Sequence, residues 1–376
     1  MVEAARLGRV AIGCDIDPLA VFVSRVKSRP LAQRKLMPTV ADLYARISPL
    51  ERDARTYERF KFSDLGPRKY RSETSSLDIP AIPNLLHWFR RYVVVDLARL
   101  RCAIRHTDAP AAHIAFLELC FASIIRGVSN ADPVPVSGLE VTAHMKRLDA
   151  QGRLINPFAM FKRVTNRAIK DMDAYADEVS GAPPVTVLRQ NATELRMPKR
   201  VIDVVITSPP YHGAVDYYRR HQLEMFWLDL VRSQEERLVL LRGYIGRSRP
   251  AKGHAFIKDG AITSETAAAV ESQIRVVSDS RADAFKHYCV GMTKVFEQVA
   301  QIIRPGRPVV LVVGHSTWNR DRLNTSSLFA SLAQPAFSLV EHLWYPVRNR
   351  YMSYSRHNDA NIDREYVLVL ERNHDA

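Results

Sequence analysis

Short apolar runs alternate along the chain with longer segments of helical periodicity. Continuous apolar runs are typical of strands buried on both faces, and they predict strands at 10–16, 185–190, 201–207, 308–314, 339–345 and 364–371. Apolar residues at helical spacing predict helices over about 18–29, 84–106, 111–127, 158–179, 215–242 and 282–304. Strands that alternate with helices indicate a doubly wound α/β sheet.

The spacing of these elements is uneven. A long, mostly helical stretch separates the first strand from the second, as an inserted module would. We therefore expect a sheet-bearing domain made of 1–30 and 181–376, with a helical insertion over 31–180. A second insertion, 232–280, is predicted to be loop with some helix.

Positive charge is concentrated in the helical insertion. The chain has 54 Lys and Arg against 40 Asp and Glu, a net charge of +14. Residues 25–106 hold 18 basic against 8 acidic side chains, and 144–170 hold 7 against 1. Such charge favours a nucleic acid partner, although a solvated basic surface would look the same. Arg90 and Arg91 stand among aromatic residues, so this segment is a candidate for phosphate contacts and base stacking.

Composition excludes several other classes. Apolar residues make up 47% and charged residues 25%, which are ordinary globular values. No run approaches the 18 apolar residues of a membrane span, and the N-terminal residues lack a signal-peptide layout. The four Cys form no CxxC pair, which suits a reducing cytoplasm, and the twelve His show no HExxH spacing, so no metal is predicted.

The sharpest local pattern is VIDVVITSPPY at 201–211. A buried strand ends in Thr207, Ser208, Pro209, Pro210 and Tyr211, at the strand end where open α/β sheets bind ligands. Two prolines fix the backbone there. A Ser hydroxyl and a Pro carbonyl can accept hydrogen bonds from one exocyclic amino group, and a Tyr ring can stack on the base that carries it.

This segment resembles the catalytic motif of the S-adenosylmethionine-dependent amino methyltransferases of DNA. The TSPPY form is the one most often seen in the cytosine-N4 enzymes, and adenine N6 is the alternative target. The segments 212–228, 302–317 and 349–370 resemble later parts of one branch of that family. The resemblance implies a Rossmann-like class I methyltransferase sheet, mostly parallel with an antiparallel last strand, and Ser208, Pro209, Pro210 and Tyr211 as catalytic residues.

The same resemblance implies a cofactor site for S-adenosylmethionine. In Gly13-Cys14-Asp15-Ile16-Asp17-Pro18, Asp15 would accept hydrogen bonds from the ribose hydroxyls and Ile16 would pack against adenine. Asp17 would cap the following helix, a role that could also explain the whole motif. Asn191 falls where the family has an acceptor for the adenine amino group, unless it only makes a strand-end turn. Thr207 completes the implied cofactor set.

The glycine-rich loop that opens this family is missing from the sequence. Among the 15 Gly, no two are separated by a single residue, so no GxG occurs. We therefore expect the family's first strand to be absent from the chain and an unpaired strand edge to be exposed in the sheet.

The resulting expectation is a cytoplasmic DNA methyltransferase that acts by direct transfer to a flipped base. Double-stranded DNA is the expected partner, together with a cognate restriction endonuclease, and Arg348, Arg350 and Arg356 are further candidates for phosphate contact. A cytosine-C5 mechanism is disfavoured because no Cys follows a Pro. Two alternatives stay open: a non-catalytic DNA-binding remnant or subunit, and an RNA amino methyltransferase.

Overall fold

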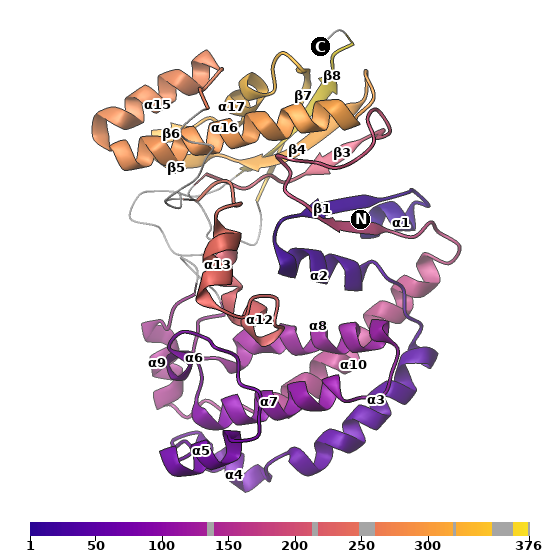
Figure 1. The fold of residues 1–376 in the computed structure, drawn as a ribbon, viewed down its shortest axis with the longest axis vertical. Coiled ribbons are helices and arrows are strands. Elements are labelled where there is room, and N and C mark those ends of the chain that lie inside the picture. The colour runs from indigo at the N-terminus through magenta and orange to yellow at the C-terminus, as the bar shows by residue number, and fades with distance from the viewer. Residues whose placement is uncertain (134–138, 213–216, 248–259, 319–320, 348–363, 375–376) are drawn as a thin grey trace. The chain divides into compact units, whose positions relative to one another are not determined.

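The chain forms two compact units. The computed structural model describes residues 1–133, 139–212, 217–247, 260–318, 321–347 and 364–374 (Figure 1). One unit comprises Met1–Arg189 and Tyr218–Leu238, and we call it the helical unit. The other comprises Gln190–Tyr217 and Val239–Ala376, and we call it the sheet unit.

The helical unit begins with a small parallel sheet. After α1 (Val2–Arg6), strand β1 (Ile12–Asp15) pairs in parallel with β2 (Thr186–Arg189). Between them in sequence, α2 (Pro18–Lys27) starts at Asp17, whose side chain accepts from the Leu19 and Ala20 amides. The Arg25 guanidinium on α2 donates to the Val187 carbonyl at 3.0 and 3.1 Å, which ties the helix to β2. The predicted strand–helix start of the chain is therefore confirmed.

The rest of this unit is helical, as the sequence predicts. Its further elements are α3 (Gln33–Ile47), η1 (Ser48–Leu50), α4 (Ala54–Phe60), α5 (Pro67–Thr74), α6 (Leu85–Trp88), α7 (Arg91–Arg105), α8 (Ala111–Val128), α9 (Ala143–Ala150) and α10 (Pro157–Glu178). Helix α12 (Gln222–Trp227) also belongs to this unit, and α11 (Tyr217–Arg220) and α13 (Gln234–Leu241) lie at its boundaries with the sheet unit. Helices α7, α8 and α10 pack on one another around fully buried aromatic side chains such as Tyr92, Phe121 and Trp227.

Helix α8 is the only described helix long and apolar enough to cross a membrane by length and composition. Half of that apolar segment is buried inside the protein. It contacts α7, α10, α12 and α2. Its hydrophobicity is therefore accounted for by a core position in the helical unit.

One predicted helix is interrupted, and the reason is a side-chain cap. The sequence predicts a helix over 84–106, but Phe89 and Arg90 are extended, and α6 ends before them. Phe89 is buried with its ring 6.0 Å from the Trp227 ring. The Asp64 carboxylate accepts from the Arg91 amide at 2.8 Å and the Tyr92 amide at 3.1 Å, so a new helix begins there. Sequence periodicity alone does not reveal a cap that lies 27 residues away.

The sheet unit contains four of the six predicted strands. Strands β3 (Val205–Thr207), β4 (Pro308–Gly314), β8 (Arg364–Arg372) and β7 (Phe337–Pro346) lie in the order β3-β4-β8-β7. Strand β3 is parallel to β4, and β8 is antiparallel to its neighbours β4 and β7. The antiparallel last strand that the sequence predicts is confirmed. A separate antiparallel pair is formed by β5 (Ser316–Trp318) and β6 (Asp321–Leu323).

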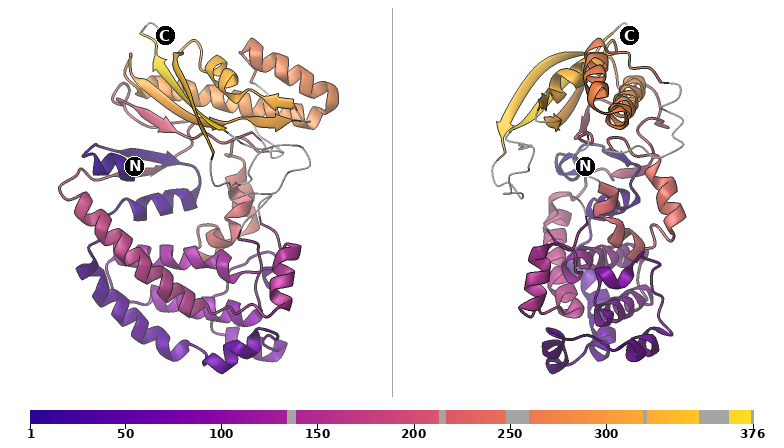
Figure 2. Two further views of the ribbon diagram at one scale, coloured as in Figure 1. Left: turned by 180° about the vertical axis from the view of Figure 1, so that it is seen from behind. Right: turned by 90° about the vertical axis from the view of Figure 1, so that its left-hand side faces the viewer.

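Helices cover one face of this four-stranded sheet. They are α15 (Glu265–Val277), α16 (Asp279–Ile302) and α17 (Thr325–Leu332), and Figure 2 shows α16 lying along the sheet. Alternate residues of β4, Val309, Leu311 and Val313, are buried and pack into this core with Phe285 and Phe329. The alternation is the period-2 pattern of a strand with one well-covered face.

Two strands have exposed apolar side chains at an edge of their sheet in the part of the chain that the structure describes. In the helical unit, β1 has β2 as its neighbour, and Ile12 is 44% exposed. In the sheet unit, β3 has β4 as its neighbour, and Ile206 is 70% exposed. Parallel strands are ordinarily buried on both faces, so exposed apolar side chains here are unusual.

The unit boundaries differ from the domain prediction. The sequence assigns 1–30 and 181–376 to one domain, whereas β1 and β2 group with the helices of the insertion. The reason is local packing: β1 and β2 pair with each other and pack on α2, which in turn contacts α8.

Candidate active site

The TSPPY segment forms a turn at the carboxyl end of β3. The strand is short and is aligned by parallel pairing of Val205 and Thr207 with β4. Ser208 is exposed, Pro209 is buried, and Pro210 and Tyr211 are half-buried. The predicted position of this segment at the carboxyl end of a strand is confirmed, and Ser208 is accessible to solvent.

The Ser208 hydroxyl has a fixed role. It donates a 3.0 Å hydrogen bond to the carbonyl of Val312 on β4. A hydroxyl has one proton and two lone pairs. Since the proton is directed to Val312, Ser208 Oγ presents acceptor lone pairs to anything that enters the site.

Tyr211 is held through its hydroxyl. This group lies 3.4 Å from Glu365 Oε1 at the start of β8, in donor geometry. The other carboxylate oxygen of Glu365 accepts from the Tyr345 hydroxyl, and this bond to a carboxylate raises the pKa of Tyr345 to about 12. Glu365 thus orients two phenol rings at the end of the sheet.

Pro210 is held by a hydrogen bond from a core helix. The Tyr288 hydroxyl on α16 donates to the Pro210 carbonyl at 2.9 Å. Gly246 has φ +84°, and a Cβ there would lie 3.2 Å from Pro210 Cβ, so the glycine permits a close approach to the turn. The sequence prediction that the Pro209 carbonyl accepts from substrate stays a prediction.

His212 follows the TSPPY segment and packs against aromatic residues of α16. Its ring lies 5.4 Å from the Phe285 ring and 5.2 Å from the Tyr288 ring. Burial lowers the pKa of His212 to about 4. The imidazole is therefore neutral at pH 7 and packs as an aromatic side chain rather than as a cation.

The predicted cofactor residues near Asp15 belong to the helical unit. Asp15 ends β1 and is exposed; its Oδ1 accepts from the Asp17 amide at 2.8 Å. Although the residue as a whole is exposed, desolvation of its carboxyl by the neighbouring chain raises the pKa of Asp15. Asp17 caps α2, as the sequence predicts. Ile16 lies between them and is half-buried.

Asn191 and Thr207 occupy strand ends. The Asn191 side chain accepts from the Thr193 amide at 3.1 Å, which is the turn that the sequence analysis keeps as an alternative. Thr207 is exposed at the end of β3. Binding of cofactor by Asp15, Ile16, Asn191 and Thr207 stays a prediction.

The arginines predicted to bind DNA differ in their surroundings. Arg90 donates to the Phe60 carbonyl at 2.6 Å and pairs with Asp149 at 2.9 Å, and its side chain is 13% exposed. It is therefore a packing residue of the helical unit, with little of its guanidinium left for a phosphate. Arg91 is 34% exposed and lies 3.8 Å from Asp64, so a phosphate contact by Arg91 stays a prediction.

Three predicted positions lie outside the described residues: Arg348, Arg350 and Arg356. Within the described ranges, no group of three or more His, Cys, Asp or Glu side chains could hold a metal ion.

Sequence reasoning missed Tyr288, Glu365 and Gly246, which position the turn. Tyr288 lies inside a helical stretch and Glu365 in a strand, where their apolar neighbours dominate the pattern. A signal for Glu365 is its place at the very start of the predicted last strand. No comparable sequence signal marks Tyr288.

Comparison with known proteins gives one full-length relative. No protein-family model matches the chain. The chain is 22% identical over 392 aligned positions to the type II methyltransferase M.MvaI of Kocuria varians, with 99% of this chain and 81% of that protein covered. A solved structure described as a DNA modification methylase from Thermus thermophilus is 12% identical over 47% of each chain with a TM-score of 0.24, too low to establish a common fold. The chain is therefore similar over nearly its whole length to a protein named as a type II methyltransferase.

Proposed function

We propose that this chain is a DNA methyltransferase that transfers a methyl group from S-adenosylmethionine to an exocyclic amino group, with cytosine N4 as the preferred target. The observation that carries the proposal is the Ser208–Tyr211 turn: Ser208 Oγ has its proton engaged by Val312, and Tyr211 is held by Glu365. The relative's name supports the reaction class. The basic helical unit supports nucleic acid as substrate.

The chemistry follows from the poor nucleophilicity of an exocyclic amine, whose lone pair is conjugated with the ring. Ser208 Oγ and the Pro209 carbonyl would each accept one N–H of the flipped base. These two hydrogen bonds draw the nitrogen toward tetrahedral geometry and free its lone pair for attack on the methyl carbon. The bound cofactor would supply the methyl group and keep the electron pair of the carbon–sulfur bond, and the methylated nitrogen would lose its extra proton to solvent.

Tyr211 would stack on the base and hold it in line with the methyl group. Its hydroxyl is bound at 3.4 Å from Glu365, so the ring loses little further freedom on binding. Positioning of this kind supplies much of the rate in a direct transfer. No covalent enzyme intermediate is required.

Asp15 is the residue proposed to bind the nucleoside part of S-adenosylmethionine. Asp15 lies exposed at a strand end with Oδ1 engaged by its own turn, so its other oxygen can accept from the ribose hydroxyls. The cofactor supplies, when bound, a methyl group on a positively charged sulfur. A glycine-rich cradle for its methionine part is not found in this sequence, which contains no GxG.

A second candidate function rests on that missing cradle and on the exposed edges of β1 and β3. Without another source for the loop, the chain would bind DNA but not cofactor, and would act as a DNA-binding subunit. The exposed Ile206, at 70%, is the observation that favours this candidate. It predicts salt-sensitive duplex binding with no detectable cofactor binding.

The test is nucleoside mass spectrometry on DNA from cells that express the chain, compared with the Ser208→Ala variant. We expect N4-methylcytosine that disappears in the variant. Ser338→Ala is the matched control, because Ser338 also makes one hydrogen bond, at 2.8 Å to Asn373, but lies on β7. N6-methyladenine would keep the mechanism and change the target base.

Cofactor binding separates the two candidates. Calorimetry with S-adenosylmethionine should show binding that weakens in Asp15→Asn and persists in Asp17→Asn, since Asn also caps helices well. Duplex binding without any cofactor binding would support the subunit. Methyl transfer to tRNA but not to duplex DNA would overturn both.

A further inference from the structure

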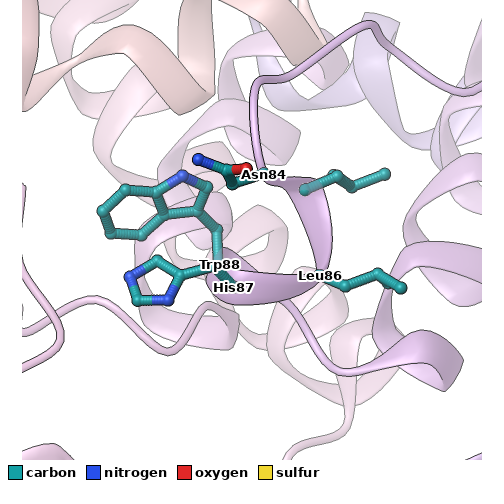
Figure 3. A pocket seen from close by; sticks show the side chains of 5 residues that line it. Asn84, Leu86, His87 and Trp88 are labelled. Atoms are coloured by element: carbon teal, nitrogen blue, oxygen red, sulfur yellow. The ribbon is translucent and has the colours of Figure 1, made fainter.

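A short turn of the helical unit displays aromatic and apolar side chains around a hollow of about 710 Å³. Asn84, Leu85, Leu86, His87 and Trp88 line it (Figure 3). Leu86 is 45% exposed, Asn84 and His87 are exposed, and Trp88 is partly exposed. None of the side chains found to line the hollow carries a fixed charge.

The two rings of this turn lie together. Figure 3 shows His87 and Trp88 on the same side of the turn as Asn84, with Leu86 directed the other way. The ring centroids of His87 and Trp88 are 4.5 Å apart and their planes meet at 80°. This side of the turn therefore combines an indole ring with the donor and acceptor of an amide.

Two hydrogen bonds from Asn130 hold the turn. The Asn130 amide nitrogen donates to the Trp88 carbonyl at 2.7 Å, and its side-chain amide donates to the His87 carbonyl at 3.0 Å. The next residue, Phe89, is buried against Trp227. An exposed aromatic group on a rigid support loses little entropy when it binds a ligand.

Asn84 adds a strained backbone conformation. Its φ of +54° and ψ of +44° lie in the left-handed region. Asn is among the residues that adopt this conformation most readily. Asn84 in this conformation directly precedes the short helix α6, Leu85–Trp88.

The net charge of the sequence segment that contains the turn indicates the class of ligand. The segment 25–106, which contains the turn, carries 18 basic and 8 acidic residues. An uncharged ring on such a segment is unsuited to bind phosphate, and is suited to the uncharged planar part of a polyanion, which is a nucleobase.

We propose that the Asn84–Trp88 turn is a base-contacting element of the DNA interface, in which Trp88 stacks on an unstacked base and Asn84 hydrogen-bonds to a base edge. The proposal rests on DNA as the substrate of this chain. It assigns base contact to a part of the helical unit distinct from the turn at Ser208.

The test measures duplex affinity over a range of salt concentrations for the wild type, Trp88→Ala and Trp88→Phe. We expect Trp88→Ala to weaken binding at least about 10-fold, or ~1.4 kcal/mol, with an unchanged slope against log salt, because stacking releases no counterions. Trp88→Phe should recover most of the affinity. Met37→Ala is the control, because Met37 is another exposed apolar residue of this unit, at 44%.

A cross-linking experiment on the wild type covers the case in which Trp88→Ala does not fold. Duplexes that carry 5-iodouracil at successive positions should cross-link to the peptide containing His87 and Trp88. Wild-type affinity in Trp88→Ala, a changed salt slope, or absence of this cross-link at every position would overturn the proposal. Failure of the wild type to bind any duplex would instead overturn the proposed function.

Discussion

The hydroxyl of Tyr288 donates a 2.9 Å hydrogen bond to the carbonyl of Pro210, which lies 78 residues earlier in the chain. This bond joins α16 to the turn that follows β3, and it connects the core of the sheet unit with the candidate catalytic segment. Tyr288 is 1% exposed, so the bond is shielded from water. Its removal therefore provides a direct test of how the turn is positioned.

Tyr288→Phe should lower the rate of methyl transfer while it leaves the fold intact. The variant leaves the Pro210 carbonyl without its donor, at a cost of about 1–2 kcal/mol in the free energy of unfolding. Tyr175→Phe is the matched control, since the Tyr175 hydroxyl donates to the Ser28 carbonyl at 3.3 Å in the helical unit. We expect both variants to lose a similar amount of stability and only Tyr288→Phe to transfer methyl groups more slowly. Equal transfer rates in the two variants would contradict a positioning role for Tyr288.

Tyr211→Phe and Tyr211→Ala should differ strongly in transfer rate. Phe keeps the stacking ring and loses the 3.4 Å contact with Glu365, so we expect a modest decrease. Ala removes the ring, and the rate should fall by about 10-fold or more, the value of one stacking contact. Single-turnover kinetics with a saturating duplex would measure both, and equal rates would exclude a stacking role.

Acid should destabilise the region around His212. Its pKa of about 4 is below the ordinary value of 6.5 because the ring is buried. The stability that the neutral ring contributes is present above pH 6.5 and is lost as the pH falls toward 4. Between pH 6.5 and 4, the free energy of unfolding of His212→Gln should fall less than that of the wild type, as measured by denaturant titrations. The same pH dependence in both proteins would contradict a buried, neutral His212.

The contribution of Glu224, in the helical unit, to the free energy of unfolding should depend on pH in the opposite direction. It is 8% exposed on α12, and burial raises its pKa from 4.5 to about 7. The proton-bound form is favoured by folding, so its contribution is complete below pH 4.5 and is lost as the pH rises through 7. Glu224→Gln should therefore stabilise the protein at pH 8 by on the order of 2–3 kcal/mol but have little effect at pH 4.5. The exposed Glu58→Gln is the control.

The exposed edge of β3 should tolerate charge. Ile206 is 70% exposed, so Ile206→Lys should change the free energy of unfolding by less than about 0.5 kcal/mol. Val309→Lys, on the neighbouring strand at 1% exposure, should be strongly destabilising because it buries a charge. Thermal unfolding of the two variants measures the contrast. Strong destabilisation by Ile206→Lys would mean that another segment covers this edge.

The sequence by itself determined the order and type of most elements. Continuous apolar runs located β4 and β8, and helical periodicity located α8 and α10 within one or two residues. The TSPPY letters located the turn after β3, because two consecutive prolines fix a backbone locally. The exposure of Ile12 and Ile206 at two strand edges is a result of the structure, and the absence of a first strand stays a prediction.

Only the tertiary structure decided which residues hold that turn and which predicted side chains are free of other partners to contact a ligand. Val312, Glu365 and Tyr288 fix Ser208, Tyr211 and Pro210, yet they lie between 78 and 154 residues away. Asp64 divides the helix predicted over 84–106, and Asp149 engages Arg90. Periodicity reports the pattern of burial along one segment, whereas caps, ion pairs and hydroxyl donors depend on contacts between segments, which are set only when the chain packs.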